Sequence, residues 1–156
     1  MKKIRRANPR TSAVEAPLKA PASLNQAQNV RGGAEKILLV DDEKQLRDVV
    51  FLYLKQMGYR VMAAESGESA QKIWSEQGGQ FDLLLTDMVM PGGLSGLQLG
   101  ELLRAQKPGL KIILSTGYGE ELADAGVVEE KGFTFLHKPF SNQVLAETVR
   151  KCLDAV

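Results

Sequence analysis

Four short apolar runs in this sequence each lead into residues that can bind a cation or an anion. Asp41 and Asp42 follow KILLV, Asp87 follows LLLT, Thr116 follows KIILS, and Lys138 follows FTFLH. Carboxylates bind hard cations, a lysine supplies a positive charge, and a hydroxyl can donate a hydrogen bond to an anion. These groups suit the transfer of a phosphoryl group onto an aspartate beside a divalent cation.

The apolar runs alternate with longer segments of helical periodicity. Continuously apolar runs are typical of parallel strands that are covered on both faces. Five strand–helix units in succession predict an α/β domain, with helices on both faces of an open parallel sheet. The expected strands are Lys36–Val40, Arg60–Ala64, Asp82–Thr86, Lys111–Ser115 and Phe133–Leu136, and the expected helices span residues 43–57, 67–77, 95–106, 120–130 and 141–154.

The carboxyl ends of parallel strands lie at one edge of a sheet, so we expect the three aspartates, Thr116 and Lys138 to converge there. Two carboxylates about 4 Å apart repel each other by roughly 4 kcal/mol at an effective dielectric constant of about 20. A cluster of three therefore requires a cation or protonation. Because these ligands are all oxygens, Mg²⁺ is the first expectation, with Mn²⁺ or Ca²⁺ next.

Four motifs in this order, ILLVDDE, LLLTDMVMP, IILSTGY and FLHKPF, resemble the receiver domain of response regulators in two-component signalling. The resemblance extends from about Lys36 to the end of the chain. It implies that Asp87 accepts the phosphoryl group. It also implies that Asp42, with Asp41 supporting it, binds Mg²⁺ together with Asp87 and the main-chain carbonyl of Val89.

The same resemblance implies a conformational switch and a particular fold. Thr116 matches the hydroxyl residue that moves towards the phosphoryl group, Phe135 matches the aromatic residue that follows it, and Lys138 matches the lysine of the site. The Lys138–Pro139 bond is expected to be cis. The implied fold is flavodoxin-like: a doubly wound five-stranded parallel sheet, in the order 2-1-3-4-5, with five helices.

The loop MPGGLSG suggests a particular kind of receiver. It is one residue longer than the commonest form and contains Gly92 and Gly93, a variant familiar in receivers of hybrid histidine kinases. We therefore expect either the C-terminal receiver of such a kinase or a single-domain regulator. The expected partner is a histidine kinase or a histidine phosphotransfer protein. We expect no direct nucleic-acid binding and a monomer, or a weak phosphorylation-dependent dimer.

Residues 1–34 differ in composition from the rest of the chain. They hold seven Lys and Arg and one Glu, a net charge of +6, whereas residues 35–156 carry −5. We interpret 1–34 as a flexible, basic, Ala/Pro-rich linker or tail and 35–156 as the receiver domain. A solvated tail is a simpler interpretation than one that binds an anionic partner. No apolar segment long enough for a signal peptide or a membrane span follows the basic start, so a cytoplasmic location is expected.

Other interpretations of the same residues stay open at this point. Asp41 also suits the cap of the first helix, Ser115 competes with Thr116 for the switch role, and His137 is expected to point away from the site.

A hydrolase of the haloacid dehalogenase type also phosphorylates an aspartate, but its second acid would fall at Val89. A flavodoxin-like electron carrier and a receiver used only for binding are further alternatives. As a receiver, the chain would not be an enzyme: it would catalyse only its own phosphorylation and its slow dephosphorylation.

Overall fold

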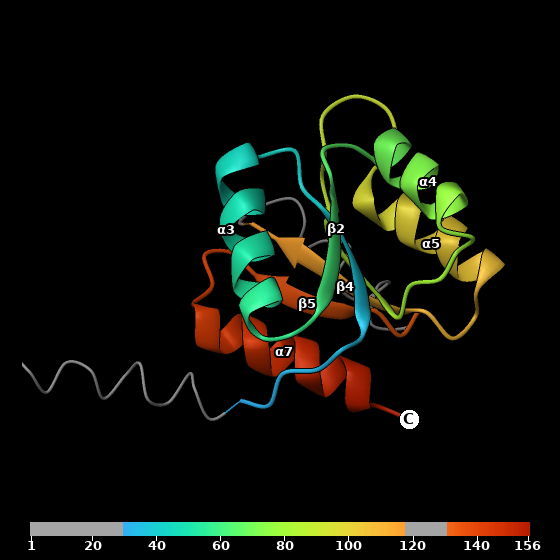
Figure 1. Cartoon of the computed structure of the whole chain (residues 1–156). Coiled ribbons are helices and arrows are strands. Elements are labelled where there is room, and N and C mark those ends of the chain that lie inside the picture. The colour runs from blue at the N-terminus through green and yellow to red at the C-terminus, as the bar shows by residue number, and fades with distance from the viewer. Residues whose placement is uncertain (1–29, 118–130) are drawn as a thin grey trace, which may run out of the picture. The chain divides into compact units, whose positions relative to one another are not determined.

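The computed structural model describes residues 30–117 and 131–156, and Arg31–Val156 form one compact unit. Five parallel strands form one sheet in the order β2-β1-β3-β4-β5, which confirms the predicted fold class (Figure 1). The predicted helix at 120–130 lies outside the described residues. The elements are β1 (Lys36–Val40), α3 (Lys44–Gln56), β2 (Arg60–Ala64), α4 (Gly67–Glu76), β3 (Leu83–Asp87), α5 (Gly96–Gln106), β4 (Lys111–Thr116), β5 (Thr134–His137) and α7 (Asn142–Asp154).

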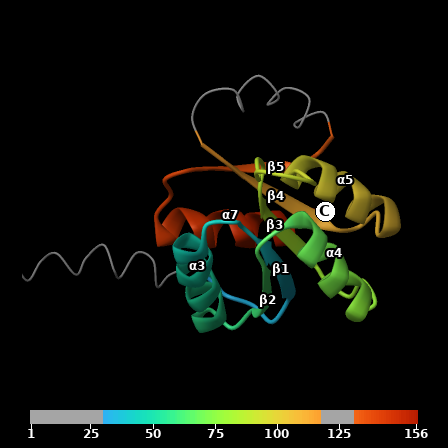
Figure 2. The same ribbon diagram turned by 90° about the horizontal axis from the view of Figure 1, so that it is seen from above.

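Helices cover both faces of the sheet. Figure 2 shows α3 and α7 on one side and α4 and α5 on the other. Alternate strand residues point to opposite faces, so Leu84 and Leu114 join the core under α4 and α5, whereas Leu85 and Ile113 join the core under α3 and α7. All four are at most 3% exposed. Burial of each such side chain contributes about 1.5–3 kcal/mol, which explains why the central strands are apolar on both faces.

Three strands end one residue later than the sequence predicted. β3 ends at Asp87, β4 at Thr116 and β5 at His137, because Asp87 is in register with Ser115 and Thr116 with His137. The strand ladder therefore continues to the edge of the sheet where the polar residues lie. These residues are held by strand backbone rather than by loops alone.

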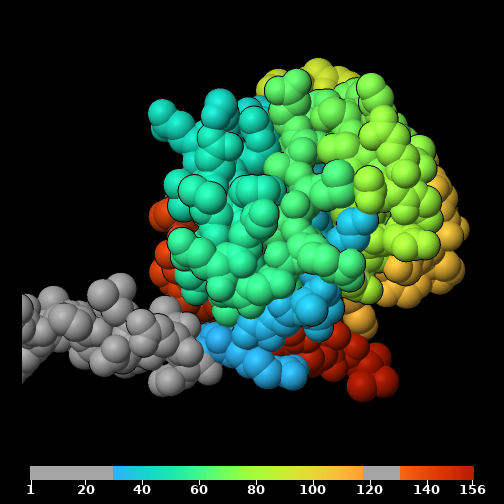
Figure 3. All heavy atoms as spheres, viewed as in Figure 1, coloured from blue at the N-terminus to red at the C-terminus, as the bar shows by residue number. Residues whose placement is uncertain are grey.

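The helices begin where the sequence predicted, within one residue. Ser95 and Ser141 cap α5 and α7 by accepting hydrogen bonds from amides three residues later. The buried residues of α3 are Val50 and Leu54, whereas Val49 is 57% exposed. On the face seen in Figure 3, α3 lies beside β2. Within the described residues, no helix has the length and apolar content that a membrane span requires.

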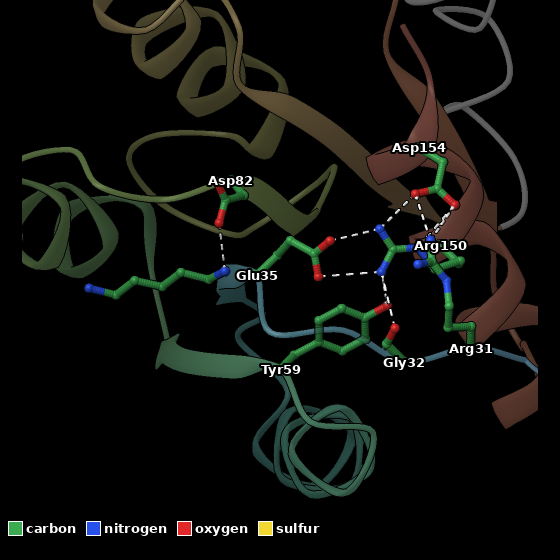
Figure 4. Close-up of polar contacts among 8 residues, drawn as sticks. Arg31, Gly32, Glu35, Tyr59, Asp82, Arg150 and Asp154 are labelled. Carbon is green, nitrogen blue, oxygen red and sulfur yellow. Dashed lines mark hydrogen bonds and ion pairs between the residues drawn. The ribbon is translucent and has the colours of Figure 1, made fainter.

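Arg150 of α7 connects the chain before β1 to the rest of the domain (Figure 4). Its guanidinium donates hydrogen bonds to the carboxylates of Glu35, at 2.7 Å, and Asp154, at 2.8 Å, and to the Gly32 carbonyl and the Tyr59 hydroxyl, both at 3.3 Å. The hydrogen bonds from Arg150 lower the pKa of Glu35. This cluster lies at the amino ends of the strands, away from the polar edge described below.

Gly96, the first residue of α5, is packed against the strand that carries Asp87. Its amide donates to the Met88 carbonyl at 2.9 Å, and a Cβ atom added to Gly96 would overlap the backbone carbonyl of Asp87. We expect Gly96→Ala to lower the free energy of unfolding by about 1–3 kcal/mol, because backbone cannot move aside as a flexible side chain can. Denaturant unfolding followed by circular dichroism would measure the change.

Gly100, one turn later in α5, is the matched control for this substitution. A Cβ atom there would make ordinary contacts with Ile112 at 3.4 Å. Gly100→Ala should therefore leave the stability unchanged or raise it, because alanine is about 1 kcal/mol more favourable than glycine within a helix. Equal effects of the two substitutions would contradict the close approach of α5 to Asp87.

Candidate functional site

Three aspartates meet at the carboxyl edge of the sheet. Asp41 and Asp42 follow β1 directly and Asp87 ends β3, and each offers a carboxylate oxygen within 4.8 Å of the other two. Asp41 is 5% exposed and Asp87 9% exposed, whereas Asp42 is open to solvent. The structure therefore brings together the three carboxylates that the sequence singled out, with one of them accessible from outside.

Lys138 lies between two of these carboxylates. Its Nζ atom is 3.3 Å from Asp41 Oδ2 and 3.3 Å from Asp87 Oδ2. The Lys138–Pro139 bond is cis, as predicted, and the Lys138 amide donates to the Thr116 carbonyl at 2.7 Å. The chain that leaves β5 is thus tied to the end of β4, and its lysine crosses to β1 and β3.

Burial dominates the electrostatics of Asp87. It raises the pKa of this carboxyl from an ordinary value of 3.8 to about 6, against the opposing effect of the Lys138 charge, and the charge of Asp41 raises it further. A hydrogen bond from the Val89 main chain acts in the opposite direction. Burial alone would lower the pKa of Lys138, but the negative charges of Asp87 and Asp41 outweigh it and the pKa is raised.

Asp41 is oriented by the start of α3. Its Oδ1 accepts a hydrogen bond from the Glu43 amide at 2.8 Å, and Arg47 of α3 donates to its carbonyl at 2.7 Å. The residue at the cap position of α3 is Glu43, whose side chain makes no capping hydrogen bond. Asp41 does not occupy the cap position that the sequence also suggested for it: its Oδ1 binds the amide of the residue before the helix, and its Oδ2 faces Lys138. Sequence reasoning did not identify Arg47, which has no motif around it.

The donor set fits a hard divalent cation. When all are ionised, three carboxylates and one ammonium leave a net charge of −2 at this edge of the sheet, which a divalent cation would balance. The acidic cluster is made only of oxygen donors, which suit Mg²⁺ better than a soft metal. Val89, whose main chain already binds Asp87, is placed beside the cluster.

The two residues of the expected switch, Thr116 and Phe135, lie on β4 and β5. Thr116 is 2% exposed, and its hydroxyl lies 3.2 Å from Nδ1 of His137. Phe135 packs against the core under α4 and α5, and its ring stacks on His137 with centroids 6.1 Å apart. His137, which we expected to point away from the site, contacts Thr116 because strand register places the two residues opposite each other. Ser115, the competitor of Thr116, sits one residue earlier and therefore faces the other side of the sheet.

The sequence matches the family model of the response regulator receiver domain over residues 37–150. It is 35% identical over 142 residues to the sensor kinase CckA of Brucella abortus, and 31% identical over 118 residues to the response regulator protein FleR of Pseudomonas aeruginosa. These matches cover 91% and 76% of this chain, but only 15% and 24% of the two relatives.

Solved structures agree with the sequence comparison. The receiver domain of the hybrid histidine kinase CckA has a TM-score of 0.63 and 34% identity, and the match covers 76% of this chain and 99% of that one. A receiver domain protein from Clostridium thermocellum has a TM-score of 0.71 and 29% identity, with 77% and 94% covered.

The fold and the acidic edge thus define a phosphorelay class of protein, and the chain belongs to the response regulator receiver domains of two-component systems. Among its relatives is the receiver of a hybrid kinase, as the loop after Asp87 predicted.

The raised pKa of Asp87 predicts a pH-dependent effect of Asp87→Asn in metal-free buffer. The pKa of Asp87 is about 6 in the folded protein, above the ordinary value of 3.8. Ionisation of Asp87 therefore lowers the free energy of unfolding as the pH rises from about 4 to 6, and the whole loss is present above pH 6. Asparagine carries no such charge. We expect Asp87→Asn to raise the free energy of unfolding by about 2–3 kcal/mol near pH 8, with no difference near pH 3.

Denaturant unfolding at several pH values, with a chelator present, checks this expectation. Asp42→Asn is the matched control, because Asp42 is exposed and should change stability much less. A gain for Asp87→Asn that persisted unchanged at pH 3 would contradict the electrostatic explanation.

Proposed function

We propose that this receiver accepts a phosphoryl group on Asp87 in a Mg²⁺-dependent reaction, from a phosphohistidine of a kinase or phosphotransfer protein. The observation that carries the proposal is the position of Lys138, 3.3 Å from both Asp41 and Asp87, beside three carboxylates within 4.8 Å of one another. This arrangement supports a site in which a nucleophile, a cation and a fixed positive charge would act at one point. Membership in the receiver family supports it.

The roles follow from the chemistry of each group. A carboxylate oxygen of Asp87 attacks phosphorus in line with the leaving imidazole; the P–N bond breaks as the P–O bond forms, and the imidazole keeps the bonding electron pair. Asp42 and Asp41, with Asp87 and the Val89 carbonyl, would hold Mg²⁺, whose charge neutralises phosphoryl oxygens. Lys138 then exchanges part of its contact with Asp87 for a phosphoryl oxygen.

Phosphorylation would switch a protein-binding surface. The Thr116 hydroxyl binds a phosphoryl oxygen, and Phe135 moves with it, which changes the surface around β5 and α7. The proposed partners are therefore proteins, with no direct role for nucleic acid. Apart from its own phosphorylation and slow dephosphorylation, the domain catalyses no reaction. A monomer, or a weak dimer formed on phosphorylation, and a cytoplasmic location complete the proposal.

Phosphorylation itself is tested by the intact mass of the protein after incubation with acetyl phosphate. We expect one phosphoryl adduct on the wild type that depends on Mg²⁺ and is absent from Asp87→Asn. The matched control is Asp48→Asn on exposed α3, which should be modified like the wild type.

An adduct that survives Asp87→Asn would contradict the assignment of the acceptor. If the folded wild type binds Mg²⁺ but acquires no adduct from acetyl phosphate or from a phosphorylated histidine phosphotransfer protein, the domain acts by binding alone. The two donors together separate a selective receiver from an inactive one.

The lifetime of the phosphoryl group should depend on Val89. This residue follows Asp87 by two positions, its side chain is 53% exposed, and an isopropyl group cannot orient a water molecule for attack. We expect slow loss of the phosphoryl group from the wild type and several-fold faster loss from Val89→Asn. Adduct mass against time measures both rates; Val89→Ile should behave like the wild type, and equal rates for Val89→Asn would contradict the role.

A further inference from the structure

His137 contacts both residues that the proposed switch would move. Its Nδ1 lies 3.2 Å from the Thr116 hydroxyl, and its ring stacks on Phe135 at an interplanar angle of 18°. The contacts have a simple structural origin: His137 is paired with Thr116 across β4 and β5, and it follows Phe135 by two residues on the same face of β5. This imidazole is the only histidine side chain of the sequence.

The hydrogen bond with His137 competes with the role proposed for Thr116. When Nδ1 is the acceptor, it uses the single hydrogen of the hydroxyl, which a phosphoryl oxygen would otherwise receive. When Nδ1 carries a proton, the imidazole donates to the hydroxyl and still fixes its position. When Nδ1 is the acceptor, the hydroxyl must therefore give up this bond before it can donate to a phosphoryl group on Asp87; when Nδ1 is the donor, the imidazole acts by fixing where the hydroxyl lies.

We propose that His137 is a positioning residue that holds the Thr116 hydroxyl in the unphosphorylated arrangement and thereby sets how readily the domain switches. The inference rests on the proposed function, because it concerns the exchange of partners by Thr116. Release of the hydroxyl frees the imidazole, and the stacked Phe135 ring loses a fixed neighbour. His137 thus couples the movement of Thr116 to the movement of Phe135.

The experiment measures how much beryllofluoride, a phosphoryl analogue, is needed to convert the Mg²⁺-loaded protein, followed by two-dimensional NMR. Three substitutions distinguish the contribution of Nδ1 from that of the rest of the imidazole. His137→Leu removes the hydrogen bond, His137→Gln places its amide nearer the Nε2 position, and His137→Asn retains a polar atom near the Nδ1 position. We expect half-conversion of His137→Leu and His137→Gln at about threefold to tenfold lower beryllofluoride than the wild type, with His137→Asn close to the wild type.

The imidazole ¹⁵N spectrum provides a readout that a merely structural role would not move. Since the chain has one histidine, its signals are unambiguous. The Nδ1 signal should shift when beryllofluoride binds, and Thr116→Val should produce a similar shift without it. An unchanged Nδ1 signal on conversion, or equal half-conversion for all three His137 variants and the wild type, would overturn the inference.

Failure of the inference is distinct from failure of the proposed function. If the wild type binds beryllofluoride and Asp87→Asn does not, the acceptor is established, and the His137 variants alone decide the role of the imidazole. If the folded, Mg²⁺-loaded wild type binds no beryllofluoride, the proposed function fails, and the inference fails with it.

Discussion

The mutual repulsion of three carboxylates at one edge of the sheet is the constraint on which the rest of this structure depends. Asp41, Asp42 and Asp87 place oxygens within 4.8 Å of one another, and burial makes the charge of Asp87 costly. Lys138 offsets part of that cost, since its ammonium lies 3.3 Å from two of the three side chains. In the proposed reaction, a divalent cation and a phosphoryl group would bring further charge of both signs to the same point. The charge imbalance at this edge would then favour both.

The sheet and helices hold this arrangement in place. β1, β3, β4 and β5 all end at the acidic edge, and their apolar residues are buried between two helical layers. Gly96 lets α5 approach the backbone of Asp87, and the Lys138 amide joins the end of β5 to β4. The Arg150 cluster fixes the opposite ends of β1 and β2 to α7. Strong packing below the edge allows an unfavourable charge cluster to persist at it.

The switch elements differ from the charge cluster in the strength of their contacts. Thr116 is buried, and among the described residues its hydroxyl pairs with an exposed imidazole. Such a hydrogen bond contributes only about 0.5–1.5 kcal/mol to stability. A hydrogen bond from the same hydroxyl to a charged group is stronger and can replace it. The contact between β4 and β5 is therefore suited to two alternative arrangements, whereas the buried strands beneath it are not.

The sequence by itself determined the class of fold and the types of residue at the strand ends, because continuous apolar runs and helical periodicity depend on local composition. The order of the strands was implied by the resemblance of its motifs to receiver domains. The sequence also predicted the convergence of the three aspartates. It did not predict that Val49 would be exposed, because the rotation of α3 depends on how it packs against its neighbours. Nor did it predict the contacts of His137 or of Arg47.

Only the tertiary structure decided these contacts. Strand register sets which side chains face each other across β4 and β5, and it is fixed by hydrogen bonds between segments separated by some twenty residues of chain. Local sequence shows that His137 and Thr116 each lie at the end of a strand, but a shift of one residue in register would turn one of them away from the other.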